Sequence, residues 1–488
     1  MEGGRAMSAA VSTKVLKAMG MFGGVRMLQI LVGIIRTKLI AVWLGPAGVG
    51  LFGIFNGAVD TVKTLAQLGM RSSSVRDIAG QTSPSAIAVT VTVVRRWGWM
   101  LGVLGAVLMV ACAPLLSRLT FGDGGMTLHY MALAVVIFFL SIANVEEAVM
   151  QGMGALARLA KASVWGAVAG FVVSVPMYYF WGIASVVLSI IAYSLATFTA
   201  TYIYKVRGIR AERPVGVGET LSSGRRFIIL GLYMTTADFI AQALSYVFIA
   251  WLNNRGGDTE VGFYQAGYTM VNRYVGLIFT ALATEYYPRL ARVATSGKRL
   301  SVFVAHEMGL ILMLLLPAVT FFITLAPWLV RILYDSRFEA AVPFITIAMA
   351  GIVMRGVSYC MSYVILAKGD GLAFLSTESV SALAGLGLNI GCYSVWGVGG
   401  LGVAYALWFL LYALIVGYVY YVRYRLTLPA SSLRLGVLTL SVTLACIVAA
   451  QCMPSTILRL SIIPVPVIAS VLVVRNLRKL IRRQRIED

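Results

Sequence analysis

Six basic residues of this chain fall inside long apolar segments, where a charge is costly unless a partner or a water-filled cavity receives it. They are Arg26, Arg36, Lys38, Lys63, Arg273 and Arg355. Only two acidic residues, Asp60 and Asp238, lie at comparable depth, which leaves a surplus of four positive charges. A guanidinium suits phosphate because its planar fork of donors matches paired oxygens. The surplus therefore favours a wet cleft that binds an anionic, phosphate-bearing ligand.

Neutral polar residues are spaced along the same segments so that they share helix faces with the charges. At 100° per residue, intervals of three and four keep side chains on one face. The polar residues that we expect to line the cleft are Asn56, Gln67, Gln265 and Asn272. Polar side chains are costly in contact with lipid, so these polar helix faces should point towards a common interior.

The two embedded carboxylates allow more than one interpretation. Asp60 and Lys63, three residues apart, would neutralise each other on one helix, and Asp238 would pair with an arginine. Alternatively, Asp60 and Asp238 are candidates for ion coupling, because a desolvated carboxylic acid binds protons more readily. Carboxylates nearer the predicted cytoplasmic helix ends are interpreted as helix-pairing groups: Glu146, Glu147, Glu285, Glu307 and Glu378.

The composition predicts an all-α polytopic membrane protein. Of 488 residues, 59% are hydrophobic and 12% are charged, and about fourteen apolar segments are long enough to span a bilayer. Of 40 Lys and Arg, 29 fall in alternate gaps between these segments and 5 in the other gaps. The positive-inside rule then places the protein in the bacterial inner membrane with both termini in the cytoplasm. The net charge of +21 lies beside membrane segments and does not indicate nucleic acid.

Short motifs recur at a shift of 212 to 216 residues. Val49-Gly50-Leu51-Phe52 recurs as Val261-Gly262-Phe263-Tyr264, and Trp181-Gly182-Ile183 recurs as Trp396-Gly397-Val398. A six-helix unit returns the chain to its starting side, so a second copy inserts in the same sense. We expect two parallel-related six-helix bundles around a central cavity, plus two C-terminal helices.

This duplication defines four expected regions of the chain. They are an N-lobe of helices 1 to 6 (1–204), a cytoplasmic linker (205–226), a C-lobe of helices 7 to 12 (227–425), and two extra helices with a basic cytoplasmic tail (426–488).

Catalytic and cofactor motifs are not evident. The two histidines, His129 and His306, lie at predicted opposite ends of the membrane, which disfavours a metal site or a His-based catalytic site. Gly48-x-Gly50-x-x-Gly53 matches a dinucleotide fingerprint only formally, since no strand precedes it. We expect no enzyme, no cofactor and no metal.

The N-terminal sequence resembles that of a known transporter family. Gly24-Val25-Arg26 through Ile34-Ile35-Arg36-Thr37-Lys38, followed by Leu44-Gly45-Pro46-Ala47-Gly48-Val49-Gly50-Leu51, resembles the opening of Wzx-type O-antigen and lipid III flippases. These form the polysaccharide transporter branch of the multidrug/oligosaccharidyl-lipid/polysaccharide (MOP) exporter superfamily. The resemblance implies movement of an undecaprenyl-diphosphate-linked oligosaccharide to the periplasmic leaflet by alternating access, for surface polysaccharide or lipopolysaccharide biosynthesis. Many relatives have twelve helices, and this chain adds two, as MurJ-type lipid II flippases do.

The resemblance also implies roles for the candidate residues. The diphosphate and neighbouring anionic sugars would be held by Arg26, Arg36, Lys63, Arg273 and Arg355. Sugar hydrogen bonds would come from Asn56, Gln67, Gln265 and Asn272. The implied partners are the lipid-linked glycan, membrane lipids, a glycan polymerase and a chain-length regulator.

Three alternatives remain open at this point. A multidrug or ion antiporter of the same superfamily would need an acidic cavity for cationic drugs, opposite in sign to the surplus found here. A lipid II flippase would differ in the headgroup alone. A membrane-embedded glycan polymerase or ligase would show a large periplasmic loop, and the predicted topology contains none.

Overall fold

The computed structural model describes residues 2–67, 69–209, 215–294, 296–453, 458–471, 473 and 475. Every regular element in these ranges is helical, and nine of the helical stretches are long and apolar enough to cross a membrane. The predicted all-helical membrane protein is therefore confirmed. The total of fourteen spanning helices stays a prediction.

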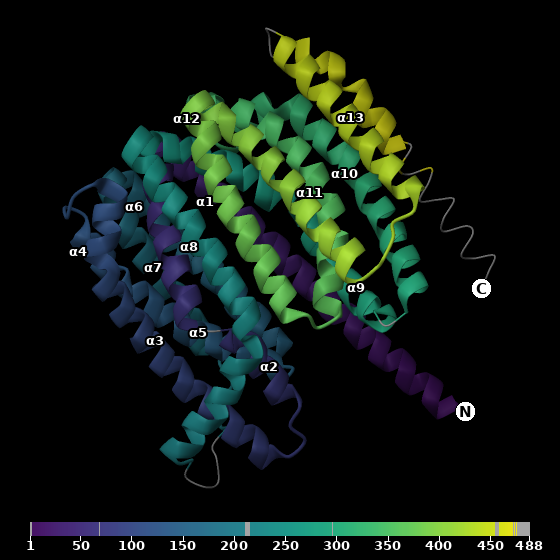
Figure 1. Cartoon of the computed structure of the whole chain (residues 1–488). Helices are drawn as coiled ribbons and strands as arrows, with labels where there is room; N and C mark the ends of the chain where they lie inside the picture. The colour runs from purple at the N-terminus through teal and green to yellow at the C-terminus, as the bar shows by residue number, and fades with distance from the viewer. Residues whose placement is uncertain are drawn as a thin grey trace. The chain divides into compact units, whose positions relative to one another are not determined.

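The chain divides into two compact units, Met1–Arg255 and Gly256–Asp488. The first contains α1 (Glu2–Gln67), α2 (Met70–Ala79), α3 (Pro84–Phe121), α4 (Thr127–Ala132), α5 (Ala134–Gly152), α6 (Leu156–Trp181), η1 (Gly182–Ser185), α7 (Val186–Tyr204) and the first part of α8 (Val217–Thr269). Within it, α6 packs against α7 and α1, and α5 packs against α3 and α7 (Figure 1). Helices α1, α5, α6 and α7 enclose the site described below.

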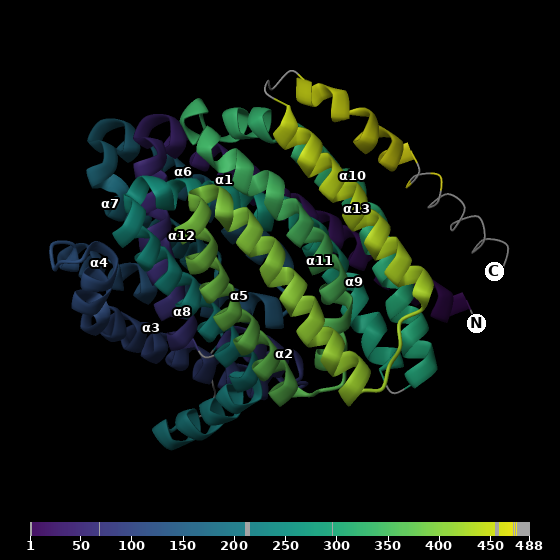
Figure 2. The same ribbon diagram turned by 45° about the horizontal axis from the view of Figure 1, so that its top comes forward.

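The second unit contains the rest of α8 and the helices that follow. These are η2 (Met270–Val275), α9 (Leu277–Val293), α10 (Gly297–Leu333), η3 (Ser336–Ala341), α11 (Val342–Ala367), α12 (Gly371–Tyr418), η4 (Val419–Arg423), α13 (Ala430–Cys452) and η5 (Leu458–Ile462). Helix α11 packs against α10 and α12, and α13 packs against α10 (Figure 2). The two units are defined by how compactly the chain packs, whereas the predicted lobes were defined by the duplication in the sequence. The lobe boundaries therefore stay a prediction.

The internal repeat extends to the backbone conformation of matching glycines. Gly45 (φ 69°, ψ −168°) and Gly257 (φ 75°, ψ 176°) are 212 residues apart and both interrupt a long helix. Gly182 (φ 57°, ψ −141°) and Gly397 (φ 59°, ψ −148°) are 215 residues apart and also separate two helical segments. Residues other than glycine rarely adopt these angles. The duplication expected from short motifs is therefore also present in the way the chain turns.

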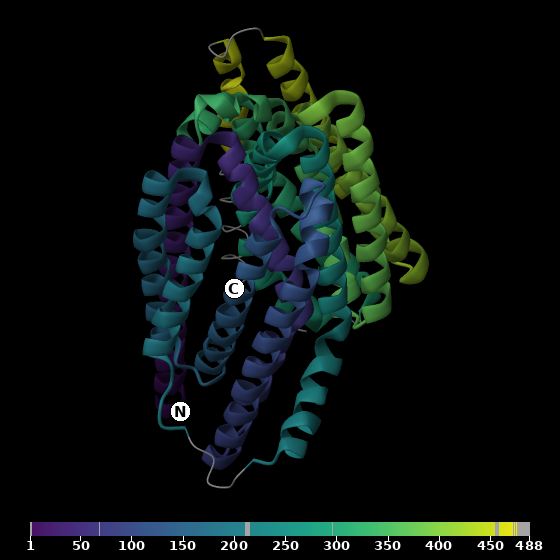
Figure 3. The ribbon, with the colours of Figure 1, turned by 90° about the vertical axis from the view of Figure 1, so that its left-hand side faces the viewer.

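The break in α1 joins two helical arms without a loop. Figure 3 shows the dark purple ribbon of α1 turning back along its length. Gly45 takes the positive φ, and Pro46 begins the second arm, a position where its missing N–H costs nothing. At Gly48 an added Cβ would lie 2.1 Å from the Cβ of Leu44, so the turn is too tight for a side chain there. The two arms are thus held together at one end.

Helix α3 illustrates how one face of a helix is exposed to lipid while the other packs against protein. Trp99, Val103 and Val107 recur at four-residue intervals and are 51 to 58% exposed. Gly98 and Gly105 lie against α5, where an added Cβ would come within 2.8 Å of Val145 and 2.6 Å of Ile137, respectively. Large apolar side chains outside and glycines at the helix contact are typical of membrane helices, which gain little from hiding apolar surface and associate through close packing.

The described part of the expected linker is bonded to α3. Arg95 donates two hydrogen bonds to the carboxylate of Glu146, both at 2.8 Å, and one to the carbonyl oxygen of Val206 at 2.8 Å. Arg96 donates to the carbonyl oxygen of Val215 at 2.7 Å. Both ends of the connection between α7 and α8 are therefore held by consecutive arginines.

Candidate functional site

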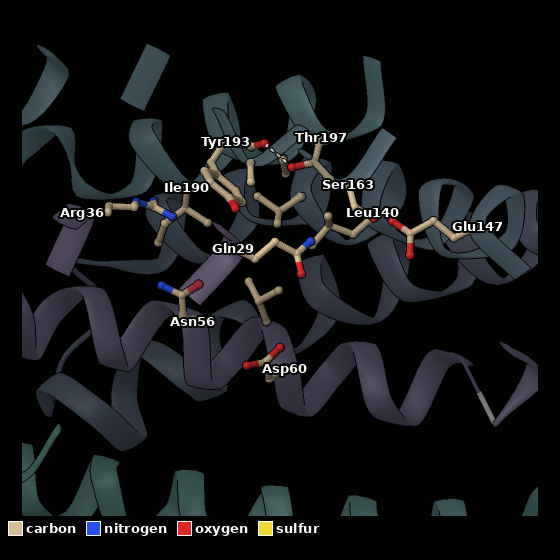
Figure 4. Close-up of a pocket in the computed structure, with 14 residues that line it drawn as sticks. Gln29, Arg36, Asn56, Asp60, Leu140, Glu147, Ser163, Ile190, Tyr193 and Thr197 are labelled. Atoms are coloured by element: carbon tan, nitrogen blue, oxygen red, sulfur yellow. Dashed lines mark hydrogen bonds between the residues drawn. The ribbon is translucent and has the colours of Figure 1, made fainter. Parts of the chain in front are cut away.

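A cavity of about 200 Å³ lies among α1, α5, α6 and α7 of the first unit (Figure 4). Its polar lining residues are Gln29, Arg36, Asn56, Asp60, Glu147, Ser163, Tyr193, Ser194 and Thr197. Both arms of α1 contribute, because the turn at Gly45 brings residues on either side of it to one site. The sequence predicted Arg36, Asn56 and Asp60 as site residues, and the structure brings these three together.

Arg36 is held by neutral groups. Its Nη2 donates to the hydroxyl of Tyr178 at 3.0 Å, and its guanidinium carbon lies 4.3 Å from the ring centroid of Tyr193 and 4.9 Å from that of Phe52. Aromatic faces attract a cation without cancelling its charge. The Nε of Arg36 is buried and has no hydrogen-bond partner among the described residues. Arg36 therefore offers a charged donor that the described side chains leave unused.

Asp60 and Lys63 form the ion pair that the sequence allowed as an alternative. The ammonium of Lys63 donates to Oδ1 of Asp60 at 2.7 Å. The Asp60 side chain is 48% exposed and lines the cavity, whereas Lys63 is not among the lining residues. Asn56, one turn earlier, donates its Nδ2 to the carbonyl oxygen of Phe52 at 2.7 Å.

Glu147 is a cavity residue that the sequence interpretation assigned to helix pairing. It does pair, because Arg71 lies 3.0 Å from its Oε2, but it also lines the cavity. Asp60 and Glu147 are thus matched by Lys63 and Arg71, and the positive charge on Arg36 has no such match in the described structure. The excess positive charge that the sequence predicted is present here as one guanidinium.

Helix α7 supplies lining residues that the sequence analysis missed. Tyr193, Ser194 and Thr197 all face the cavity from this helix. Their spacing of one and four residues places them on one side of an otherwise apolar segment. That polar line was the available signal, and the absence of charge on it is why it was overlooked.

The second unit contains a comparable arginine. Nη1 of Arg355 donates to Oδ1 of Asn272 at 2.8 Å, and the hydroxyl of Tyr405 donates to the same oxygen at 3.1 Å. The guanidinium carbon lies 5.0 Å from the ring centroid of Phe279 and 5.4 Å from that of Phe409. No carboxylate of the described chain forms an ion pair with Arg355.

Asn272 also has an unused donor. Its Nδ2 is buried without a hydrogen-bond partner among the described residues. Because arginine can only donate, the oxygen of the Asn272 amide must face Arg355, so the unused atom is the NH₂ group. The sequence predicted Arg355 and Asn272 as site residues, and they are in direct contact.

The remaining predicted residues are distributed as follows. Gln67 lies near the end of α1 and its Nε2 is buried without a partner in the described structure. Gln265 is half-buried on α8, and Arg273 is exposed in the π-helical turn η2. Asp238 is exposed on the first part of α8. The side chain of Arg26 lies outside the described residues.

Metal-binding chemistry has no obvious place in the part of the chain that is described. No three His, Cys, Asp or Glu side chains gather there in a group that could hold an ion. The cofactor and metal expectations stay predictions.

The comparison with known families gives a match over most of the chain. Residues 8–343 match the family described as "Polysaccharide biosynthesis protein". The search of curated proteins returned no match.

The fold is similar to those of solved transporters. The lipid II flippase MurJ in an inward closed conformation superposes with a TM-score of 0.72 at 13% identity, over 94% of this chain and 99% of that chain. An inward-facing multidrug resistance MATE family transporter of the MOP superfamily gives 0.67 at 16% identity, over 86% and 96%. A MOP superfamily transporter from Pyrococcus furiosus, described as having a binding pocket of reverse polarity, gives 0.60 at 16% identity, over 84% and 96%.

At these identities the structural likeness establishes the fold alone. The superfamily that has this fold is one of transporters, which agrees with the expectation that the chain is not an enzyme. The chain therefore belongs to the polysaccharide biosynthesis protein family and is a multi-pass membrane protein with the fold of the MOP-superfamily transporters.

Proposed function

We propose that the chain is a Wzx-type flippase that moves an undecaprenyl-diphosphate-linked oligosaccharide from the cytoplasmic to the periplasmic leaflet. The observation that carries the proposal is the unused Nε donor of Arg36, which belongs to a guanidinium without a carboxylate partner in the described structure. A buried charged donor without an acceptor costs free energy, and a ligand that brings acceptors and negative charge removes that cost. A diphosphate brings both.

The candidate residues divide by chemistry in this proposal. The diphosphate and neighbouring anionic sugars are held by Arg26, Arg36, Lys63, Arg273 and Arg355. Amide hydrogen bonds to sugars come from Asn56, Gln67, Gln265 and Asn272. Lys63 must share its charge with Asp60, which it already contacts. The lipid tail stays in the bilayer, and a glycan polymerase with its chain-length regulator receives the product.

Asp238 is the residue that we propose for coupling transport to an ion gradient. It lies on an apolar part of α8, it is exposed, and no described residue forms an ion pair with it. Asp60 is the other candidate, but it already contacts Lys63. In proteoliposomes, Asp238→Asn should abolish the response of transport to an imposed proton or sodium gradient while headgroup binding persists. An unchanged gradient response in Asp238→Asn, with loss in Asp60→Asn, would move the coupling role to Asp60.

A lipid II flippase is the second candidate, because the fold matches MurJ over nearly the whole of both chains. It requires the same diphosphate chemistry and differs in the attached sugars and peptide. A multidrug antiporter shares the fold as well. The unmatched cation of Arg36 in the cavity argues against a cationic drug as the ligand.

Complementation separates these candidates. A strain that lacks its surface-polysaccharide flippase should regain surface glycan when this chain is expressed, whereas a strain depleted of its lipid II flippase should not grow. Rescue of the second strain alone would overturn the proposal in favour of lipid II, and drug resistance without glycan would favour the antiporter.

Variants then test the site. Arg26→Ala, Arg36→Ala and Arg355→Ala should abolish glycan assembly, because losing a hydrogen bond to a charged group costs about 1.5–3 kcal/mol, roughly 10- to 150-fold in affinity. Arg118→Ala is the matched control, since Arg118 is exposed at the end of α3. Immunoblots of membranes should show equal protein. Normal glycan in the Arg36 and Arg355 variants would remove these residues from the site.

A further inference from the structure

The guanidinium of Arg36 is hydrogen-bonded to a buried tyrosine outside the cavity lining. Its Nη2 atom donates to the hydroxyl of Tyr178 at 3.0 Å. Arg36 lies on α1, and Tyr178 lies on α6, 142 residues further along the chain. Tyr178 is 1% exposed and is not among the residues that line the cavity. It can therefore influence a ligand in the cavity only through Arg36.

A second hydroxyl continues this contact away from the cavity. Oγ of Ser189, on α7, lies 2.8 Å from the hydroxyl of Tyr178 and 2.7 Å from the carbonyl oxygen of Val186. A serine has one hydroxyl hydrogen and a carbonyl can only accept, so Ser189 donates to Val186 and accepts from Tyr178. Arginine can only donate, which agrees with this direction. The hydrogen bonds thus run in one direction, from Arg36 through Tyr178 and Ser189 to the backbone of α7.

The two hydroxyls meet because α6 and α7 are joined by a tight turn. Tyr178 is four residues before Gly182, and Ser189 is seven residues after it. Gly182 has φ 57°, and its N–H donates to the backbone carbonyl oxygen of Tyr178. Ser185 donates its hydroxyl to the carbonyl oxygen of Gly182 at 2.7 Å. The turn therefore fixes the backbone on both sides of the contact between Tyr178 and Ser189.

Two aromatic rings and this hydrogen bond together restrain the guanidinium. Its central carbon lies 4.3 Å from the ring centroid of Tyr193 and 4.9 Å from that of Phe52, and Figure 4 shows Arg36 close to Tyr193. The Tyr193 ring is held against α6, because a Cβ added at Gly170 would lie 2.5 Å from its Cδ2 atom. Attraction to a ring is compatible with several directions of the N–H bonds, whereas the bond to Tyr178 selects one. The unused Nε donor of Arg36 therefore has a fixed direction.

We propose that Tyr178 is a positioning residue that orients Arg36 for the diphosphate, and that Ser189 fixes the direction of the Tyr178 hydroxyl. This inference rests on the proposed flippase function and adds residues that do not touch the ligand. A donor that is held in place before binding lowers the ordering cost of the complex. If the guanidinium could swing, the ligand would have to order it, and affinity would be lost.

Tyr178→Phe tests the first bond, because phenylalanine keeps the ring and removes only the hydroxyl. Binding of undecaprenyl diphosphate without a sugar, to the full-length protein in nanodiscs, should weaken at least about 3-fold. This is part of the roughly 10- to 150-fold expected when a whole hydrogen bond to a charged group is lost. Tyr179→Phe is the matched control, since the Tyr179 side chain is 66% exposed and its ring packs against Trp43. The control should leave binding unchanged.

A double-mutant cycle separates positioning from a purely structural role. If Tyr178 acts through Arg36, adding Tyr178→Phe to Arg36→Ala should weaken binding no further than Arg36→Ala alone. A structural role would weaken binding by the same factor with and without Arg36. Equal factors, or unchanged binding in Tyr178→Phe, would overturn the inference and leave the flippase proposal standing. Unchanged binding in Arg36→Ala would overturn the inference together with the role of Arg36 in the proposed function.

Ser189→Ala tests the second bond and supplies another variant in case Tyr178→Phe unfolds the protein. It leaves the Tyr178 hydroxyl without its acceptor, so binding of the same lipid should weaken about 2-fold or more. Ser185→Ala is the matched control, because Ser185 makes the same kind of bond to a backbone carbonyl three residues earlier and none to Tyr178 in the described structure. It should leave binding unchanged. Equal effects of the two variants would overturn the role of Ser189.

Discussion

Arg36 and Arg355 show how a membrane protein can keep a buried cation available. Each guanidinium lies close to two aromatic rings and bonds to a neutral oxygen instead of a carboxylate. Aromatic rings and neutral acceptors position the guanidinium and lower the free-energy cost of burying it, but they do not neutralise its charge. A carboxylate partner would stabilise the fold and compete with the substrate.

Asn272→Asp tests this reasoning directly. The new carboxylate would lie where the amide oxygen now lies, 2.8 Å from Nη1 of Arg355, and would form a charge-assisted bond. We expect the melting temperature to be equal or higher while glycan export falls at least about 10-fold, since the cation is neutralised. Gln451→Glu, exposed on α13 of the same unit, is the control for an added charge without that contact. Full export by Asn272→Asp would show that the free charge of Arg355 is not needed.

Asp370 provides a pH-dependent contribution to stability outside the spanning helices. Burial alone would raise the pKa of its carboxyl, but hydrogen bonds from the backbone N–H of Ala373, from Tyr424 and from Arg423 outweigh burial and hold the pKa below the usual 3.8. Because the folded-state pKa is the lower one, this stabilisation is complete at neutral pH. It is lost as the pH falls below about 3.8 towards the folded-state value.

Asp370→Asn should therefore lower the melting temperature at pH 7 and have a much smaller effect at pH 3. The amide can still cap α12, so the loss at pH 7 should be about 1 kcal/mol, from the charge alone. Thermal unfolding in detergent at both pH values measures the difference. A penalty that is the same at pH 7 and pH 3 would rule out a role for the charge.

The sequence predicted the residues of the cavity in part, for identifiable reasons. A charge in an apolar segment is conspicuous, so the cavity residues Arg36 and Asp60 were found. Tyr193 and Glu147 line the same cavity as Arg36 because of the way α5 and α7 pack against α1. This packing could not be predicted from the local sequence of either helix. The Lys63 contact with Asp60 was foreseen as an alternative because both lie three residues apart on one helix.

At the scale of elements, glycine turns replace loops at matching places in the two halves. Gly397 separates the two parts of α12 with φ 59° and ψ −148°, close to a region that is essentially restricted to glycine. Short motifs in the sequence located these positions, but they could not show that helices meet there without a loop. That outcome follows from single backbone angles, which composition does not specify.

Gly397→Ala should destabilise the protein by about 1–3 kcal/mol, because alanine is strained at this φ. Gly391→Ala, six residues earlier in α12, is the matched control: an added Cβ there meets nothing within 4 Å. It should stabilise the helix by about 0.5–1 kcal/mol. Melting temperatures of the two variants should shift in opposite directions, and a shift of the same sign in both would contradict the assigned backbone conformation.

At the scale of the whole molecule, the distribution of Lys and Arg predicts the orientation. The segment around Gln81 lies in a gap rich in basic residues, and the segment around Gly124 lies in a gap with one. Both residues are exposed in short connections between helices. The positive-inside rule places Gln81 in the cytoplasm and Gly124 in the periplasm.

Cysteine labelling tests this orientation. In a variant whose five native cysteines are replaced, Gly124→Cys should react with a membrane-impermeant maleimide in intact cells. Gln81→Cys should react only after the cells are permeabilised. The reverse pattern would invert the topology, so the side of the protein that releases the transported substrate would face the cytoplasm.

The turn at Gly45 has a consequence for the register of the two arms of α1. Arg36 precedes Gly45 by nine residues and Asn56 follows it by eleven, which at 1.5 Å per residue puts them about 14 and 17 Å from the same pivot. Similar numbers of residues on the two sides of Gly45 bring a cation and its polar neighbours to a similar depth. A single residue inserted between Gly45 and Asp60 would turn the second arm by about 100° and carry its polar line away from the first. The number of residues between Gly45 and Asp60 is therefore as tightly constrained as the types of the residues that line the cavity.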